Sequence, residues 1–376
     1  MKAEAFAGKI RQLGIETVVG VPDSALKPFC DYMNGEGQKQ FTHYVPANEG
    51  AAVGIGIGNY LATGKPVCIY AQNSGIGNMV NPITSLANEA VYGIPMLLVI
   101  GWRGEPGTKD EPQHKFMGNM TESMLDTLQI EYAILAKELP SDEVEKAFDR
   151  ARDALRKERQ FAFLIKRDFF EPETKCVYQN NHRLVREQAI HEIISAIGER
   201  DVVVSTTGKI SREVYEQSNQ IKGNHAQDFL TVGGMGHASM IAFGIAQARQ
   251  DKRVYCLDGD GAVLMHMGGL AFLGKQRPDN LVHICLNNEA HESVGGMPTG
   301  CAGMEYAEAA ASCGYPVTYV VEDAPALRKV LEAIKPVHEL TFIEIKVALS
   351  SRTDLGRPVE SAQENKVHFM SCHGEK

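Results

Sequence analysis

Residues 254–291 read VYCLDGDGAVLMHMGGLAFLGKQRPDNLVHICLNNEAH and decide the fold. An apolar run ends in LDGDG at 257–261, and a second apolar run at 281–286 ends in the pair Asn287-Asn288. The residues between them have helical spacing, so the stretch predicts a strand, a tight glycine turn, a helix and a second strand. We expect the two strand ends to lie side by side at one edge of a parallel sheet.

The polar residues at these two strand ends suit a hard metal ion. Asp260 supplies a carboxylate oxygen and Asn288 an amide oxygen, while Gly261 opens a helix whose free N–H groups favour phosphate. Oxygen ligands beside a phosphate site indicate Mg²⁺ or Ca²⁺ shared with a diphosphate rather than zinc. Either half alone is more often structural, because GDG is a common turn and an Asn pair often caps a helix.

GDG followed about thirty residues later by NN resembles the signature of thiamine-diphosphate enzymes. The resemblance implies thiamine diphosphate and Mg²⁺ as cofactors, with the metal held by Asp260, Asn288 and the backbone carbonyl of Ala290. The other cofactor contacts that it implies in this and other segments are Ser74, Thr207, Gly208, Gly233, Gly259, Gly261 and Ala262.

Strands alternate with helical patterns along most of the 376 residues, which predicts parallel sheets covered on both faces. We expect an α/β protein with two doubly wound domains of the thiamine-diphosphate-binding fold and no middle domain. The predicted boundaries are a pyrimidine-binding domain at 1–166, a linker at 167–183, a diphosphate-binding domain at 184–350 and a polar, irregular tail at 351–376.

Composition narrows the class of protein further. The formal net charge is −9 with both signs interspersed, and no basic tract indicates nucleic-acid binding. No apolar stretch approaches the ~18 residues of a membrane span, and the N-terminus lacks the apolar core of a signal peptide. The eight cysteines form no CxxC pair. We therefore expect a cytoplasmic protein with reduced thiols that binds neither nucleic acid nor a membrane.

Glu49 is the candidate catalytic acid in the first half. It precedes the small residues GAAVGIG at 50–56 and occupies the first turn of a predicted helix, where the helix dipole favours a carboxylate. A glutamate in this position is usually only a cap. The resemblance to thiamine-diphosphate enzymes implies instead that Glu49 binds the aminopyrimidine ring of the cofactor and shares a proton with it.

Three further segments follow predicted strands: GVPDS (20–24), NSGIGN (73–78) and GWRGEPGTKDEPQH (101–114). The last has the length and Pro/Gly content of an active-site loop, although a solvated surface loop is an equal alternative. Together the three resemble the group of decarboxylases that act on phosphonopyruvate or sulfopyruvate.

That resemblance implies a small anionic 2-oxo acid as the substrate, and a buried anion needs cations and N–H groups around it. The residues that we predict to bind or line the substrate site are Arg103, Lys109, Lys209, Asp23, Ser24 and His114. Either His114 or His291 is expected to relay the proton to the product. Lys209 follows Ser205-Thr206-Thr207-Gly208 at a predicted helix start, and a lysine there often simply faces water.

Met235 lies in TVGGMGH at 231–237, after another predicted strand. A lone methionine is usually a core residue. In thiamine-diphosphate enzymes a bulky apolar residue in this place supports the bent shape of the cofactor, and Met235 matches it.

The implied reaction is the decarboxylation of 3-phosphonopyruvate to phosphonoacetaldehyde and CO₂. In this family the two halves of one site come from different subunits, so a homodimer is the expected minimum. The alternatives left open are sulfopyruvate decarboxylation, carboligation and a catalytically silent cofactor-binding protein.

Overall fold

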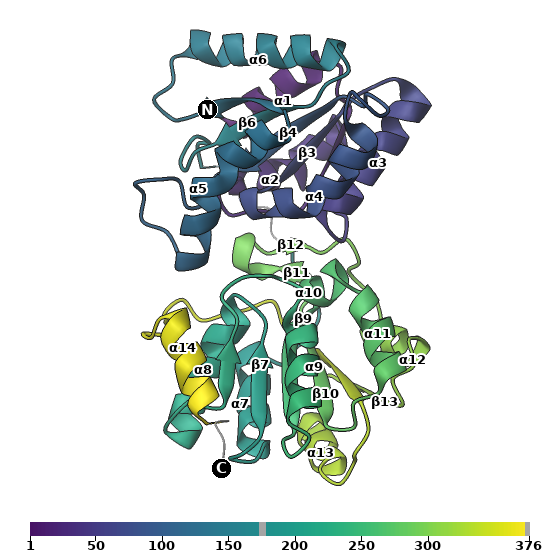
Figure 1. Cartoon of the computed structure of the whole chain (residues 1–376), viewed down its shortest axis with the longest axis vertical. Coiled ribbons are helices and arrows are strands. Elements are labelled where there is room, and N and C mark those ends of the chain that lie inside the picture. The colour runs from purple at the N-terminus through teal and green to yellow at the C-terminus, as the bar shows by residue number, and fades with distance from the viewer. Residues whose placement is uncertain (173–177, 373–376) are drawn as a thin grey trace. The chain divides into compact units, whose positions relative to one another are not determined.

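The computed structural model describes residues 1–172 and 178–372 (Figure 1). The chain forms two compact units: unit 1 comprises Met1–Tyr178 and His291–Gly300, and unit 2 comprises Gln179–Ala290 and Cys301–Lys376. The change from unit 1 to unit 2 falls inside the segment predicted as a linker. The inclusion of His291–Gly300 in unit 1 is a feature that the predicted boundaries did not contain.

Unit 1 is built around a six-stranded parallel sheet with the order β2-β1-β3-β4-β6-β5. Its main elements are α1 (Ala3–Gln12), β1 (Thr17–Gly20), α2 (Lys27–Met33), β2 (Thr42–Tyr44), α3 (Glu49–Thr63), β3 (Val67–Gln72), α4 (Ile76–Pro82), β4 (Met96–Gly101), α5 (Pro112–Thr127), β5 (Glu131–Leu135), α6 (Ser141–Arg156) and β6 (Phe161–Ile165). Two short strands, β11 (Ala290–His291) and β12 (Met297–Pro298), pair with each other.

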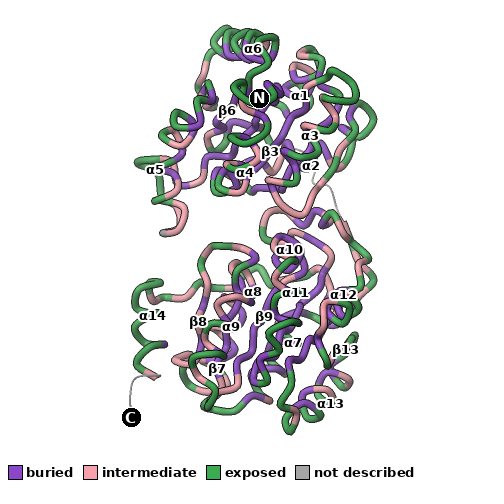
Figure 2. The backbone as a smooth tube through the Cα atoms, turned by 45° about the vertical axis from the view of Figure 1, so that its right-hand side comes forward, coloured by how far each residue is buried: buried purple, intermediate pink, exposed green. Residues whose placement is uncertain are grey.

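Alternate residues of each strand enter two separate apolar cores, one on each face of this sheet. Val18 packs with α1, α2 and α6, whereas its neighbour Val19 packs with α3, α4 and α5. Side chains along a strand point to opposite faces, so strands covered on both sides must be apolar throughout. Figure 2 shows β3 and β6 buried, as this arrangement requires.

The beginning of the predicted linker belongs to the first core. Phe169 and Phe170 are 2% and 5% exposed. Their rings lie 5.9 and 5.2 Å from the ring of Phe6, in edge-to-face geometry that favours aromatic pairs. The aromatic pair therefore closes unit 1 instead of connecting two domains loosely.

Unit 2 has a second six-stranded parallel sheet, β13-β14-β10-β9-β7-β8. Counted from β8, its strand order repeats that of the first sheet. Its elements are α7 (Arg186–Ala196), β7 (Val202–Ser205), α8 (Lys209–Lys222), β8 (Asp228–Leu230), α9 (Ala238–Ala248), β9 (Val254–Gly259), α10 (Asp260–Met265), α11 (Gly268–Gln276), β10 (Leu281–Asn287), α12 (Tyr306–Ser312), β13 (Val317–Val321), α13 (Ala324–Ile334), β14 (Thr341–Lys346) and α14 (Ala362–Ser371).

The apolar faces of α7, α8 and α13 cover one side of this sheet and form its main core with β7, β9, β10 and β14. On the other side α9 lies against β7, β9 and β10, and α12 lies against β13 and β14. The predicted fold of two doubly wound α/β units is therefore confirmed. In both sheets the order reverses next to β1 or β7, and ligands of such sheets bind near this reversal, beyond the carboxyl ends of the strands.

Three local predictions were wrong. Part of the tail that was predicted as irregular is helical, because Ser361 and Glu364 form a capping box that begins α14. The helix α5 begins at Pro112, inside the segment 101–114 that was predicted as a loop, so the loop after β4 is shorter than expected. The helical stretch after Asp260 is split into α10 and α11 by His266-Met267.

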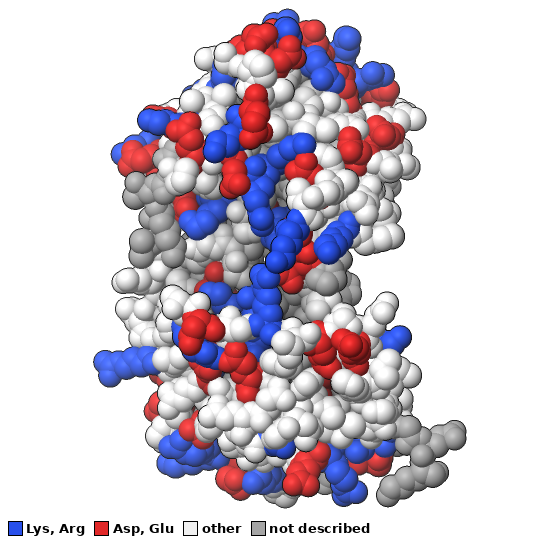
Figure 3. Space-filling model, turned by 90° about the vertical axis from the view of Figure 1, so that its left-hand side faces the viewer, with Lys and Arg blue, Asp and Glu red and all other residues white. Residues whose placement is uncertain are grey.

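Surface properties agree with the composition. Acidic and basic side chains are mixed over the top and the bottom of the face that Figure 3 shows. Among the described residues, no helix combines the length and the apolar character needed to cross a membrane. The cysteines Cys30, Cys68, Cys256, Cys285, Cys301, Cys313 and Cys372 are all unpaired.

Candidate active site

Glu49 is the first residue of α3 and is 5% exposed. The Asn48 side chain caps this helix by accepting a hydrogen bond from the Ala51 amide at 2.9 Å. Glu49 Oε2 accepts a hydrogen bond from Asn78 Nδ2 at 2.7 Å. A Cβ atom at Gly75 would lie only 2.5 Å from Glu49 Oε1, so the backbone can pass this oxygen only at a glycine. The buried carboxylate is thus held in place from two sides.

Asp23 and Ser74 are connected through Gln72 at the end of β3. Gln72 Nε2 donates to Asp23 Oδ1 at 2.6 Å, and Ser74 Oγ donates to Gln72 Oε1 at 2.7 Å. Burial raises the pKa of Asp23, and the hydrogen bond from Gln72 opposes this shift. Asp23 is 0% exposed, whereas Ser74 is exposed. The predicted lining role of Asp23 is therefore indirect, through Gln72 and Ser74.

Arg103 is bound by a residue that the sequence analysis did not single out. Its Nε and Nη2 donate to the two oxygens of Asp110 at 2.9 and 2.7 Å, and its Nη1 donates to Ser24 Oγ at 2.7 Å. Asp110 also accepts from the amides of Gly104 and Glu111. Although burial opposes it, this contact with Arg103 lowers the pKa of Asp110 below its usual range. Arg103 thus fixes the loop after β4 as well as presenting a positive charge.

The two loops meet at one cavity of unit 1. It has a volume of about 470 Å³ and is lined by Ser24, Trp102, Arg103 and Asp110, together with Arg167 from the start of the predicted linker. Arg167 is exposed and was not predicted as a site residue. The lining combines the cations Lys27, Arg103 and Arg167 with the carboxylates of Asp31, Glu105, Asp110 and Asp168, so the cavity by itself does not select the charge of a ligand.

The remaining candidates of unit 1 are less constrained. Lys109 is exposed on the loop after β4. His114 lies in the first turns of α5 and is half-buried; burial, assisted by the charge of Arg103, lowers its pKa. Burial also lowers the pKa of His291 to about 4. Both imidazoles are therefore neutral at physiological pH, and the role of either in proton transfer stays a prediction.

In unit 2, Asp260 lies directly after β9 and is 3% exposed. Burial raises the pKa of Asp260 to about 7, and backbone hydrogen bonds from Gly261 and Asn288 lower it only in part. Among the described residues, Oδ2 of Asp260 has no hydrogen-bond partner. An uncompensated buried carboxylate oxygen is costly, so the site favours a cation at this oxygen.

The turn after β10 brings Asn288 and Ala290 to the same edge. Asn288 Oδ1 accepts a hydrogen bond from the Ala290 amide at 3.1 Å, and Asn180 Nδ2 donates to the Asn288 carbonyl at 2.9 Å. Glu289 lies between them with φ +60°, a left-handed conformation that is uncommon for residues other than glycine. Such backbone strain occurs often at binding sites, where the surrounding contacts maintain it.

Asn287 stabilises this turn through hydrogen bonds of its side chain. Its Nδ2 donates to Glu344 Oε1 at 2.8 Å, and its Oδ1 accepts from the Glu289 amide at 3.0 Å. Glu344 is fully buried in β14 and also accepts from the Ala307 amide at 2.9 Å. The first asparagine of the pair therefore acts as a support, and the backbone of the second is hydrogen-bonded to Asp260.

The segment from Thr207 to Lys209 follows β7. Gly208 has φ +97° and ψ −136°, which favours glycine at the residue before α8. Thr207 is half-buried beside it. Lys209 Nζ donates to Ser351 Oγ at 2.6 Å. The lysine predicted to meet the substrate is thus hydrogen-bonded to the C-terminal segment of its own unit.

Met235 lies in the turn between β8 and α9. Gly234 and Gly236 on either side have φ +66° and +86°, and a Cβ atom at Gly236 would meet the His266 ring at 2.6 Å. Met235 and Gly233 are half-buried. The glycines produce a tight turn that presents one apolar side chain, as the predicted contact with a cofactor requires.

The donor set fits a magnesium diphosphate group better than a soft metal. Asp260 and Asn288 offer oxygen atoms only, and Mg²⁺ is usually bound by one or two carboxylates together with phosphate oxygens. The unpartnered oxygen of Asp260 is the feature that such an ion would satisfy.

Comparison with known families agrees with these two half-sites. The model described as "Thiamine pyrophosphate enzyme, N-terminal TPP binding domain" matches residues 2–130, and the corresponding C-terminal TPP binding domain matches residues 206–345. These matches define the class as a thiamine pyrophosphate enzyme and confirm the predicted thiamine diphosphate cofactor.

Three curated relatives are similar over most of the chain. The phosphonopyruvate decarboxylases of Streptomyces viridochromogenes and Streptomyces hygroscopicus are 33% and 34% identical. The alignments cover 98% and 92% of this chain and 94% and 87% of the relatives. The sulfopyruvate decarboxylase of Methanosarcina acetivorans is 26% identical, over 89% of this chain and 88% of that protein. The chain belongs to the phosphonopyruvate decarboxylase family of thiamine pyrophosphate enzymes.

Proposed function

We propose that the chain catalyses the thiamine-diphosphate- and Mg²⁺-dependent decarboxylation of 3-phosphonopyruvate to phosphonoacetaldehyde and CO₂. The observation that carries the proposal is the buried Asp260 oxygen, unpartnered among the described residues, beside Asn288 in a chain that also buries Glu49 at the start of α3. The choice of substrate is supported by the two phosphonopyruvate decarboxylases among the relatives.

The second unit binds the diphosphate end of the cofactor and its metal ion. Asp260 and Asn288 bind the metal through side-chain oxygens and Ala290 through its carbonyl, while Thr207 and Gly208 contact the diphosphate. Bound thiamine diphosphate supplies the nucleophilic carbon and the electron sink that loss of CO₂ requires. Met235 supports the cofactor from its apolar side.

Glu49 holds a proton for the aminopyrimidine ring. Its Oε2 is engaged by Asn78, so Oε1, beside Gly75, is the oxygen that shares the proton. Burial keeps water away from this carboxylate, which prevents a competing proton acceptor.

The substrate's anionic groups lie near Arg103 and Ser24, with Lys109 reaching over from the exposed loop. Arg103 is already oriented by Asp110, so little side-chain freedom is lost when it meets the anion. Lys209 contacts the substrate anion after its hydrogen bond to Ser351 breaks. His114 or His291 donates the proton that completes the product.

The proposed active form is at least a homodimer, in which Glu49 of one protomer acts with Asp260 of its partner. A cytoplasmic location is also proposed, since unpaired thiols are typical of reducing compartments.

Turnover of phosphonopyruvate and sulfopyruvate under identical conditions tests the substrate. We expect CO₂ release that depends on Mg²⁺ and thiamine diphosphate. Phosphonoacetaldehyde should form from phosphonopyruvate faster than sulfoacetaldehyde forms from sulfopyruvate. Faster formation of sulfoacetaldehyde would assign the alternative substrate, and a condensed product in the presence of added aldehyde would indicate carboligation.

Glu49→Gln tests the mechanism. We expect loss of CO₂ release with thiamine diphosphate still bound, as measured by calorimetric titration. Glu36→Gln is the matched control, because Glu36 is an exposed glutamate of the same unit. A Glu49→Gln enzyme that decarboxylates normally would exclude the proposed proton transfer.

A further inference from the structure

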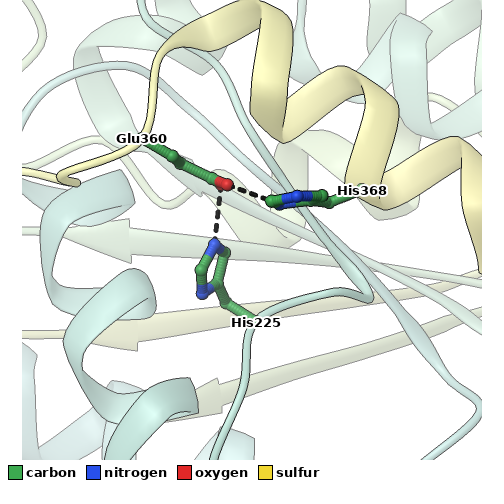
Figure 4. Close-up of side chains that lie close together, drawn as sticks. All are labelled: His225, Glu360 and His368. Atoms are coloured by element: carbon green, nitrogen blue, oxygen red, sulfur yellow. Dashed lines mark hydrogen bonds and ion pairs between the residues drawn. The ribbon is translucent and has the colours of Figure 1, made fainter.

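His225, Glu360 and His368 form a cluster in unit 2 that the proposed reaction does not use. Figure 4 shows the Glu360 carboxylate between the two imidazole rings, with His368 on α14 and His225 on the segment before β8. One potential metal-ligand atom of each residue lies within 4.8 Å of the others. Glu360 and His368 are eight positions apart, whereas His225 lies 135 positions before Glu360 and meets them because α14 packs on β8.

Each of the two ring nitrogens of His225 lies within hydrogen-bond distance of an oxygen atom. Its Nδ1 lies 3.0 Å from Asn219 Oδ1, and its Nε2 lies 2.7 Å from Glu360 Oε1. The Asn219 amide is oriented by its other end, because Nδ2 donates to the Tyr215 carbonyl at 2.7 Å. Both ring nitrogens therefore face acceptors, and a neutral imidazole has only one N–H to donate. A second proton or a cation must lie between His225 and Glu360.

Glu360 is the shared centre of the cluster. His368 Nδ1 lies 2.7 Å from Oε2, and Asn365 Nδ2 donates to Oε1 at 3.0 Å. The side chain of Glu360 is 11% exposed and that of His225 is 17% exposed, whereas His368 is 58% exposed. The cluster is thus enclosed on two sides and open to an incoming ion on the third.

We propose that these residues bind a divalent transition-metal ion, zinc being the best match, through His225 Nε2, the Glu360 carboxylate and His368 Nδ1. Two imidazoles and one carboxylate, with water as the fourth ligand, is a zinc donor set. Ligand atoms around a tetrahedral zinc ion lie about 3.3 Å apart, so the present 2.7 Å pairs separate by about 0.6 Å. The Asn219 contact supplies the acceptor that orients a metal-bound imidazole.

The site would fasten α14 to an edge strand. Asn365 on this helix accepts from the Leu230 amide at 3.1 Å and donates to the Asp228 carbonyl at 3.0 Å, so it covers the free edge of β8. Phe369 packs against Phe229 with ring centroids 5.6 Å apart. β8 leads into the turn that carries Met235. Metal binding therefore stabilises the strand that precedes a cofactor-binding turn.

The test is a calorimetric titration of the full-length protein with Zn²⁺. The protein is first stripped with a chelator and then saturated with excess Mg²⁺ and thiamine diphosphate, so that the cofactor site is occupied. We expect one equivalent of zinc to bind and the thermal denaturation midpoint to rise, because a ligand that binds the folded state stabilises it.

His368→Ala is the decisive variant, since this exposed side chain is the least needed for folding. We expect its zinc affinity to fall by at least about tenfold and the stabilisation by zinc to disappear. His225→Ala should behave in the same way, and His338→Ala, at an exposed histidine of the same unit, should bind zinc like the wild type.

Two results would overturn the proposal. One is a wild-type protein that takes up no zinc in the calorimetric titration. The other is a folded His368→Ala protein that binds the same equivalent of zinc with unchanged affinity.

Discussion

The two units have the same strand order but differ in how the polar residues that follow their strands are hydrogen-bonded. In unit 1, β3 and β4 are followed by Ser74 and Arg103, whose side chains are hydrogen-bonded to Gln72 and Asp110. In unit 2, β9 and β10, the strands in the same places of the sheet order, are followed by Asp260 and Asn288, and one oxygen of Asp260 has no partner.

The difference extends beyond the strand ends. Of the buried side-chain atoms without a hydrogen-bond partner in the described residues, all but Gln113 Oε1 belong to unit 2. An unsatisfied buried polar atom costs about 1–3 kcal/mol, although His182 Nε2 and His283 Nε2 lie 3.6 and 3.5 Å from carboxylate oxygens of Glu289 and Asp258. At the strand ends, unit 1 therefore holds its polar side chains with its own hydrogen bonds, whereas unit 2 leaves one oxygen of Asp260 for what it binds. This contrast predicts opposite responses to ligands and to mutation.

Asp260→Asn is expected to have the largest effect. The variant loses the charge that the metal requires, so Mg²⁺–thiamine diphosphate affinity should fall by at least about 100-fold and turnover should disappear. The ligand-free protein should remain folded, because removal of an unpaired buried charge costs little. Calorimetric titration and thermal denaturation without cofactor measure the two effects.

Asp279→Asn is the control for this substitution, since Asp279 is exposed in the same unit. It should bind the cofactor like the wild type. Unchanged cofactor affinity in Asp260→Asn would mean that the unpartnered oxygen is not a metal ligand, and the contrast between the units would lose its functional meaning.

Gly75→Ala tests how closely unit 1 is organised. The added Cβ would lie 2.5 Å from Glu49 Oε1, so the carboxylate must move from its place beside Asn78. Since small displacements of a reacting group are costly, we expect kcat to fall by about 10- to 100-fold with cofactor binding largely retained.

Gly77→Ala provides a matched comparison two residues further on. A Cβ atom there has no heavy atom within 4 Å, and alanine is favoured over glycine inside a helix such as α4. Its kcat should equal that of the wild type. Equal kcat values for the two variants would show that Glu49 tolerates displacement and that unit 1 is not tightly preorganised.

Asp228→Asn tests whether a buried carboxyl group reduces stability at the amino end of β8, away from the strand ends that are proposed to bind the cofactor. Burial raises the pKa of Asp228 to about 6, above its ordinary value of 3.8. The folded state then holds more protons than the unfolded state between about pH 4 and 6, so the free energy of unfolding falls as the pH rises through this window.

The substituted protein cannot ionise at this position and should not lose that stability. We expect it to exceed the wild type by about 3 kcal/mol at about pH 8 and to match it near pH 4, as measured by urea denaturation. The exposed Asp279→Asn should follow the wild type at both pH values. Equal stability of Asp228→Asn and wild type at the higher pH would show that Asp228 is compensated in the folded protein.

The sequence was most informative where the structure depends on local signals. α3 begins at Glu49, in agreement with the predicted helix start, because Asn48 caps it there, and Gly64 ends it in the left-handed conformation. The apolar strands predicted two doubly wound sheets, and the GDG and NN segments predicted the edge where Asp260 and Asn288 meet.

Contacts that depend on the folded loops could not be predicted in this way. Asp110 pairs with Arg103 across seven positions of an irregular segment, and no period or motif marks it as a partner. Glu344 supports Asn287 from another strand, 57 positions away. Asn78 and Gly75 lay within the quoted NSGIGN segment, but only the packing of α4 on α3 shows that both contact Glu49.

Ser361→Ala is expected to have the smallest effect. It tests whether α14 protects β8, the edge strand of the sheet in unit 2. The helix that Ser361 and Glu364 begin was not predicted, because it buries only Asn365 and Phe369 and so has no apolar period. Loss of the cap should destabilise the protein by about 0.5–1 kcal/mol. Ser371→Ala, at the other end of α14, removes a hydroxyl that caps no amide and should cost less.

Hydrogen exchange at Leu230, whose amide donates to Asn365, reports on the strand itself. Faster exchange there in Ser361→Ala alone would show that α14 protects the edge of unit 2. Equal exchange in both variants would mean that β8 is stable without the helix, and that unit 2 needs completion only at its cofactor edge.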